Sequence, residues 1–129
     1  MKTLVILFAI ILGENLVAQE WKFIIKSADG TEYYYKPNTS KTAWVKQVSS
    51  KTSYYSKEEN GQKKIVDGYH VCLWKFDCEE KKMGLAQQNT YNTTGEVLSA
   101  ITFKDYDIEM IYPNPDSIAE NLINTFCSN

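Results

Sequence analysis

The stretch that decides the fold is residues 69–78, which read YHVCLWKFDC. Successive side chains of an extended strand point to opposite faces, so the even-numbered residues of this stretch share one face. That face carries His70, Cys72, Trp74, Phe76 and Cys78. Val71 and Leu73 belong to the opposite face. Apolar groups on both faces predict a central strand that is covered on both sides for part of its length.

Five further segments have the aromatic and β-branched composition that is typical of strands. They are residues 21–27, 31–36, 42–48, 83–91 and 96–103. Turn-forming residues separate these segments, namely Asp29-Gly30, the loop at 36–40 with Pro37, the charged residues 79–82, and residues 92–95. Strands that follow one another through short turns predict a six-stranded antiparallel sheet.

Two segments do not follow this pattern. Residues 49–68 consist mainly of Ser, Lys, Glu, Asn and Gly, interrupted by Tyr54 and Tyr55. We expect them to form an exposed, mobile loop. Residues 105–112 fit neither a helix nor a strand clearly, so the sequence assigns them no element.

The C-terminal segment has the pattern of an amphipathic helix. Ser117 and Glu120 have the spacing of a capping box, which marks a helix start. Apolar residues then recur at helical spacing, at Ile118, Leu122 and Phe126. The predicted fold class is therefore α+β, a six-stranded antiparallel sheet with one C-terminal helix packed on one of its faces.

The beginning of the chain has the pattern of an export signal. Lys2 precedes an apolar run at residues 3–12, which is too short to span a bilayer, and small or neutral residues end at Ala18. We therefore predict a signal peptide at residues 1–18 and a single domain at residues 19–129. No cysteine lies near the cleavage point, so we expect an exported protein without a lipid anchor. A buried N-terminal helix is the alternative interpretation.

The composition excludes several classes of function. The 129 residues have a formal charge of −2 and no arginine, so a nucleic-acid partner is not expected. A single histidine, His70, excludes multi-histidine metal sites, and a lone histidine is more often structural than catalytic. The sequence contains no phosphate-binding loop, nucleophile elbow or paired-carboxylate motif. We expect no enzymatic activity, no cofactor and no metal.

Three cysteines allow one disulfide, which export permits. Cys72 and Cys78 lie on one predicted strand and would be roughly 20 Å apart when it is extended, which is too far for a bridge. Cys127 is therefore expected to pair with one of these two. The remaining thiol is expected to be buried or to form an intermolecular disulfide, and no cationic neighbour or helix N-terminus activates Cys72.

Tyrosines and lysines supply the candidate contact residues, because tyrosine brings rigid amphipathic area to protein interfaces. The candidates are Tyr34 in the tyrosine-rich strand, and Tyr54, Tyr55, Lys57, Lys63 and Lys64 in the segment 49–68. The alternative is an ordinary solvated loop whose two tyrosines pack back on the sheet.

Motifs spread over nearly all of residues 19–129 carry a family resemblance. The less specific ones are Trp21, Asp29-Gly30-Thr31 with the tyrosines and Pro37, and Ala43-Trp44-Val45. The more specific ones are Trp74-Lys75-Phe76-Asp77-Cys78, Thr90-Tyr91 followed by Gly95-Glu96-Val97, and residues 115–123 closing on Cys127. With these residues the chain resembles the bacterial surface-adhesin protein E family.

The resemblance implies a disulfide between Cys78 and Cys127 and the same sheet-and-helix fold. Named members of that family are lipid-anchored surface proteins that bind vitronectin, laminin and plasminogen. This chain differs from them in having Cys72 and in having no cysteine at the position of lipid attachment.

Two functions from different classes follow. The first is an exported, non-enzymatic binding module of the cell envelope that binds a host matrix or plasma protein. The alternative is a periplasmic inhibitor or small-ligand carrier that uses the sheet face not covered by the helix. Both fit a location in the periplasm, at the cell surface or outside the cell, and a homodimer formed through an open sheet face or edge strand.

Overall fold

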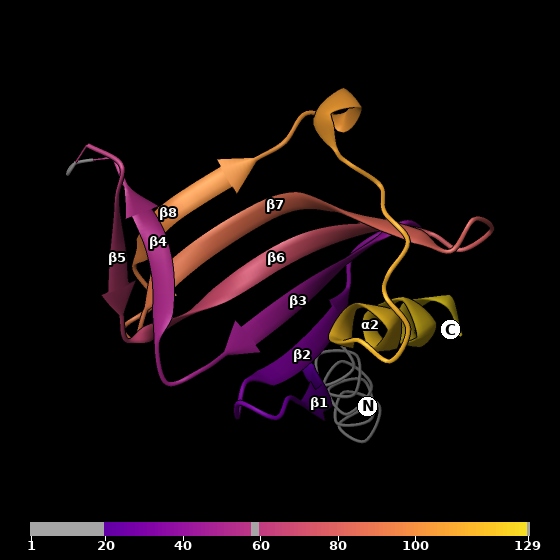
Figure 1. Cartoon of the computed structure of the whole chain (residues 1–129), viewed down its shortest axis with the longest axis horizontal. Helices are drawn as coiled ribbons and strands as arrows, with labels where there is room; N and C mark the ends of the chain where they lie inside the picture. Colours follow the sequence, from indigo (N-terminus) through magenta and orange to yellow (C-terminus); the bar gives the residue numbers. More distant parts are fainter. Residues whose placement is uncertain (1–19, 58–59, 129) are drawn as a thin grey trace, which may run out of the picture.

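The computed structural model describes residues 20–57 and 60–128, and the predicted signal peptide lies outside the described residues. The main sheet is antiparallel and six-stranded, in the order β1-β2-β3-β6-β7-β8 (Figure 1). Its strands are β1 Lys22–Lys26, β2 Glu32–Pro37, β3 Thr42–Val48, β6 Gly68–Asp77, β7 Lys82–Asn92 and β8 Val97–Thr102. These are the six predicted strands, and β6 lies between β3 and β7 as expected of a central strand.

The predicted loop at residues 49–68 is wrong. Most of it forms a second antiparallel sheet, with β4 at Thr52–Ser56 and β5 at Gln62–Val66 (Figure 1). Thr52 and Ser56 are buried although they are polar, because this hairpin packs against the main sheet. Asn60 and Gly61 have positive φ angles of 57° and 77°, a conformation that asparagine and glycine adopt most readily.

The loop predicted around Pro37 also begins later than expected. Pro37 is the last residue of β2 and lies opposite Ala43 of β3. A proline is tolerated there because the strand ends at that residue and the missing N–H interrupts no further pairing.

Residues 105–112 form a short 3-10 helix, η1, at Asp105–Asp107, followed by a bridge to the main sheet. The backbone groups of Ile111 and Met83 exchange two hydrogen bonds of 2.9 Å. This passage runs close to Gly84, where an added Cβ would lie 2.7 Å from the carbonyl oxygen of Glu109. The absence of a side chain at Gly84 therefore allows the two backbones to approach.

The C-terminal helix α2 spans Ile118–Cys127 and confirms the predicted element. The Ser117 hydroxyl accepts the Glu120 N–H at 3.2 Å, as an N-cap does. Leu122 and Ile123 are only 3% and 2% exposed and pack against Val45 and other core residues on one face of the main sheet.

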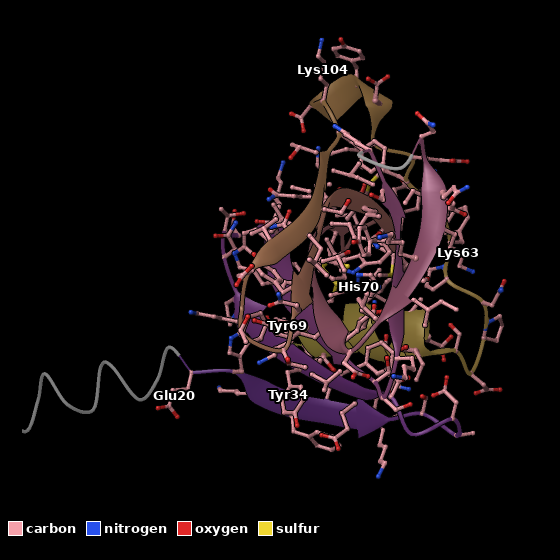
Figure 2. The ribbon with its side chains drawn as sticks, turned by 90° about the vertical axis from the view of Figure 1, so that its left-hand side faces the viewer. Glu20, Tyr34, Lys63, Tyr69, His70 and Lys104 are labelled. Atoms are coloured by element: carbon pink, nitrogen blue, oxygen red, sulfur yellow. A yellow bond between two sulfur atoms is a disulfide. The ribbon has the colours of Figure 1, made fainter. Side chains whose placement is uncertain are left out.

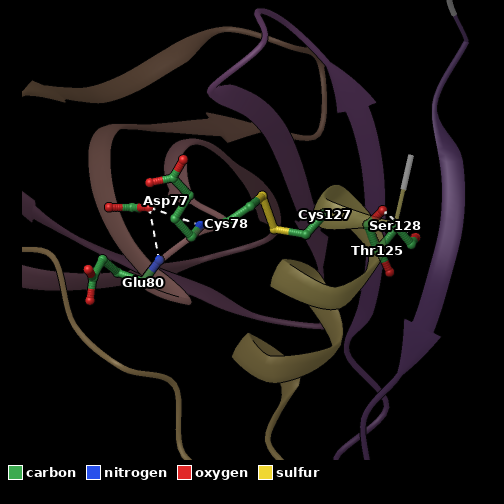
Figure 3. Close-up of a disulfide and its surroundings, with 7 residues drawn as sticks. Asp77, Cys78, Glu80, Thr125, Cys127 and Ser128 are labelled. Atoms are coloured by element: carbon green, nitrogen blue, oxygen red, sulfur yellow. Dashed lines mark hydrogen bonds between the residues drawn. A yellow bond between two sulfur atoms is a disulfide. The ribbon is translucent and has the colours of Figure 1, made fainter.

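A disulfide joins Cys78, just after β6, to Cys127, the last residue of α2 (Figure 3). Their Cα atoms are 5.7 Å apart and their sequence separation is 49. At the other side of Cys78, the Asp77 carboxylate accepts the N–H groups of Glu79 and Glu80, each at 3.1 Å, and so orders the turn into β7. The bridge implied by the resemblance is confirmed, and it fixes the end of the helix to the end of the central strand.

Candidate functional site

The main sheet has two faces that differ in what covers them. The row Tyr35, Val45, Cys72 and Gln88 runs across four strands on the face that packs against α2. The neighbouring row Tyr34, Lys46, Val71 and Asn89 lies on the opposite face, since adjacent residues of a strand alternate. We call this second side the open face.

The hairpin β4–β5 is held to the helix-bearing face through His70. The His70 Nδ1 atom is 2.9 Å from the Thr90 hydroxyl, and its Nε2 atom makes a short contact with the Thr52 hydroxyl. Burial lowers the pKa of His70 below its ordinary value of 6.5. Figure 2 shows His70 within the body of the molecule. Both ring nitrogens are thus engaged by hydroxyl groups, which makes His70 a structural link between the two sheets.

The outer side of this hairpin carries several of the predicted contact residues. Tyr55 is 66% exposed and lies opposite Lys63 on the neighbouring strand, while Ile65 beside them is 67% exposed. Lys57, at the tip of β4, is also exposed. We call these four residues the hairpin patch.

Tyr54 and Lys64 lie opposite each other on the inner side of the hairpin and are half-buried. The alternative of two tyrosines packed back on the sheet therefore describes Tyr54 and not Tyr55. A cleft of about 460 Å³ separates β4 from the edge strand β8. Its walls include Tyr54, Tyr55 and Lys57 on one side and Val97, itself 58% exposed, on the other.

Tyr34 does not join the other five candidates. It lies on the open face, where its hydroxyl donates to the Glu32 carboxylate and its ring contacts Phe23 edge-on at 5.7 Å. Figure 2 shows Tyr34 and Lys63 on separate parts of the molecule. Five of the six predicted contact residues therefore belong to the hairpin, and the sixth belongs to a different surface.

The open face contains a groove whose lining residues the sequence did not predict as a site. It has a volume of about 400 Å³ and is lined by Trp21, Lys36, Trp44, Lys46, Tyr69, Val71, Asn89 and Tyr91. We call it the open-face groove. No single strand contains enough of the lining residues to predict a groove. The sequence shows aromatic residues alternating with lysines, at Tyr34 and Lys36 and at Trp44 and Lys46, but only the strand order shows which of these residues lie side by side.

Cations and aromatic rings alternate along the open-face groove. The Lys46 ammonium lies 5.0 Å from the centroid of Tyr69 and 5.9 Å from that of Trp21, and Lys36 is also 5.9 Å from Trp21. Tyr69 stacks on Tyr91 with centroids 5.2 Å apart and planes 17° apart. These are cation–π and stacking geometries, which link the lysines and the rings that line the groove.

Neither cysteine chemistry nor a metal centre emerges from the residues that the structure describes. Cys72 is buried and unbridged, and burial raises the pKa of its thiol to about 12, so it is a packed, unreactive side chain. Over residues 20–57 and 60–128, no three His, Cys, Asp or Glu side chains gather into a group that could hold a metal ion.

The comparisons with known proteins give one result. The profile of the family described as surface-adhesin protein E matches residues 21–128. No curated protein and no solved structure matched the chain. In the described part of the chain, no helix has the length and apolar character needed to cross a membrane. Because the match covers nearly all of the chain, this protein belongs to the surface-adhesin protein E family.

Proposed function

We propose that this protein is an exported, non-enzymatic binding module that attaches to a host matrix or plasma protein through the hairpin patch. Membership of the family supports a surface-adhesin-like role. The named family partners vitronectin, laminin and plasminogen are the first ligands to test. The observation that carries the location is the exposure of Tyr55 and Ile65, two large side chains at about two-thirds exposure on one small hairpin.

The chemistry of the hairpin patch suits a protein ligand. Tyr55 and Ile65 offer apolar area, and Lys57 and Lys63 flank them with positive charge. Aromatic residues are enriched at interface cores, and the rims of interfaces are polar and solvent-accessible. The adjoining cleft between β4 and β8 extends this surface toward the exposed Val97, so a ligand segment could contact both elements.

The hairpin is also positioned firmly enough to present these side chains. The contact of Thr52 with His70 holds it to the main sheet, and an ion pair of 2.6 Å joins Lys51 to Asp67 at its base. That ion pair is exposed and contributes little to stability. The His70 contact is the more important of the two, because it is partly buried.

The test is saturable binding of the oxidised chain to vitronectin, laminin and plasminogen over a range of salt concentrations. We expect at least one ligand to bind and its affinity to fall as salt rises, because exposed charges are screened. Lys57→Gln and Lys63→Gln should weaken binding. Lys22→Gln and Lys26→Gln are the matched controls, because they remove exposed lysines from β1, the opposite edge of the main sheet. Failure of all three ligands to bind, or equal losses in the controls, would refute the proposal.

One observation favours the second candidate function, a periplasmic inhibitor or small-ligand carrier that uses the open face. A carrier needs a concave site, and the open-face groove has a volume of about 400 Å³, at the lower end of the range for small-molecule sites. This second function predicts that a small ligand binds the open-face groove and that variants of the hairpin patch do not change its affinity.

A further inference from the structure

We propose that the open-face groove binds an acidic saccharide, a sugar unit whose carboxylate is held by Lys36 and Lys46 and whose ring packs on the tryptophans. This inference does not depend on the role of the hairpin patch. It gives the open face a ligand class of its own, distinct from the protein ligand proposed above.

The first argument is charge. The Lys36 and Lys46 ammonium groups are each 5.9 Å from the centroid of Trp21, and both lysines line the groove. Among the described residues neither of them makes an ion pair with a carboxylate. Glu32 lies on the same face, where its carboxylate accepts the Tyr34 hydroxyl, and no ion pair within the described residues joins it to either lysine. Two cations that line one groove without a carboxylate partner favour an anionic ligand.

The second argument is the shape and chemistry of the walls. Trp21, Trp44 and the stacked pair of Tyr69 and Tyr91 provide flat aromatic surfaces around the lysines. The C–H groups on one side of a pyranose ring pack well on such surfaces, because they are weakly positive and the ring face is negative. Asn89 adds an amide at the same place, and its Nδ2 atom lies 3.4 Å from the Tyr91 hydroxyl. Amide and hydroxyl groups suit the hydroxyl-rich rim of a sugar.

The third argument separates a saccharide from a peptide. Apart from Trp21, the groove lies over β2, β3, β6 and β7, and each of these strands has a paired neighbour on both sides. Their backbone N–H and C=O groups are therefore used within the sheet. An extended peptide gains affinity by pairing with free backbone groups at a sheet edge, which this groove does not offer. A saccharide needs only the side-chain groups that are present.

The size of the groove agrees with a short ligand. Its volume of about 400 Å³ accommodates one or two sugar rings rather than a folded domain. Long polysaccharides bind by placing one such segment in the site, so a free oligosaccharide is a valid probe.

The experiment uses the oxidised chain and four probes. Sialyllactose and a hyaluronan tetrasaccharide carry a carboxylate on different sugars, lactose is the neutral counterpart of the first, and tetraglutamate is an acidic peptide. Tryptophan fluorescence reports on the site because Trp21 and Trp44 line the groove, and calorimetry gives the affinity. We expect saturable binding of at least one acidic saccharide, at least tenfold tighter than lactose and tetraglutamate. The saccharide that binds shows whether sialylated or uronic-acid glycans are the source.

Three variants decide where the ligand binds. Lys46→Gln and Lys36→Gln should each weaken binding at least tenfold, a loss in the range of one charge-assisted hydrogen bond. Lys82→Gln should leave affinity unchanged. It is a matched control because Lys82 also lies over an aromatic ring, 4.8 Å from the centroid of Tyr112, but outside the groove. Thermal melts confirm that each variant is folded.

Three results would overturn the proposal. They are no binding of either acidic saccharide at millimolar concentration, binding of tetraglutamate at least as tight, or an equal loss in Lys82→Gln. Each of these leaves protein binding by the hairpin patch untouched, and loss of protein binding in the hairpin variants leaves the groove untouched. The two proposals can therefore fail separately.

Discussion

Removal of the Cys78–Cys127 disulfide should destabilise the protein more than the loss of any other single feature tested below. The bridge closes a sequence separation of 49 residues. In the chain-entropy treatment, a loop of that length lowers the entropy of the unfolded chain by about 14 cal/mol/K, or ~4 kcal/mol at room temperature. The double variant Cys78→Ser with Cys127→Ser removes this constraint without leaving an unpaired thiol.

The loss should appear as a lower melting temperature. Unfolding entropy is about 2.1 cal/mol/K per residue, so a domain of about 110 residues has about 0.23 kcal/mol/K. A loss of ~4 kcal/mol then lowers the melting temperature by about 17 °C. Urea unfolding monitored by circular dichroism measures the free energy directly.

Cys72 supplies the internal comparison. It is buried and unbridged, so Cys72→Ser places a hydroxyl in an apolar site and should cost about 1–2 kcal/mol. The free-energy loss in the double variant should clearly exceed this, because the disulfide joins α2 covalently to the end of β6, whereas Cys72 forms no bridge. Equal losses for the two changes would refute the reasoning, as would peptide mapping that found Cys72 bridged to Cys127.

Three further changes test other parts of the structure. Burial lowers the pKa of His70 in the folded chain below the ordinary value of 6.5. As the pH falls below 6.5, His70 is therefore protonated in the unfolded chain before it is protonated in the folded chain. The free energy of unfolding should therefore fall as pH drops below that value, and urea titrations of His70→Gln should show a weaker fall; an unchanged pH dependence would contradict this. Gly68→Ala should cost about 2–3 kcal/mol in urea unfolding, since its Cβ would lie 2.0 Å from the carbonyl oxygen of Tyr91; a neutral effect would count against the close approach. Ser117→Ala should cost about 1 kcal/mol through loss of the helix cap, and a melting temperature equal to that of the parent would exclude the cap.

The main sheet was predictable because each of its strands has a recognisable pattern within its own stretch of sequence. Alternation identifies the central strand, aromatic and β-branched composition between turn residues identifies the other five, and the spacing of Ser117 with Glu120 identifies the start of α2. The bulge on β7 was not predictable. Leu73 lies opposite Gln87 and Trp74 opposite Leu85, so Ala86 is an extra residue whose position depends on the neighbouring strands.

The hairpin β4–β5 escaped prediction for a different reason. Its composition is polar, and Thr52 is buried where it meets His70, which comes from a strand later in the chain and also contacts Thr90. A polar residue that is buried through distant partners looks like a loop residue in the sequence. Asn60-Gly61 was the available signal, since this dipeptide favours the turns of hairpins.

One candidate surface was predictable from the sequence and the other was not. The sequence indicated Tyr55, Lys57 and Lys63 because they lie close together in the chain, and the hairpin keeps them close in space. The open-face groove draws Lys46 and Tyr69 from strands separated by the whole hairpin. Contacts of that kind follow from the strand order, which the sequence pattern alone does not define.

Binding of the oxidised chain to vitronectin, laminin and plasminogen, compared among three proteins, tests the assignment of the hairpin patch most directly. The proteins are the parent, the variant Tyr55→Ser with Lys63→Gln, and the groove variant Lys46→Gln. We predict that the parent binds at least one ligand, that the hairpin variant binds it at least tenfold more weakly, and that Lys46→Gln binds it as the parent does. Binding that survives in the hairpin variant and is lost in Lys46→Gln, or no binding by the parent, would contradict the assignment.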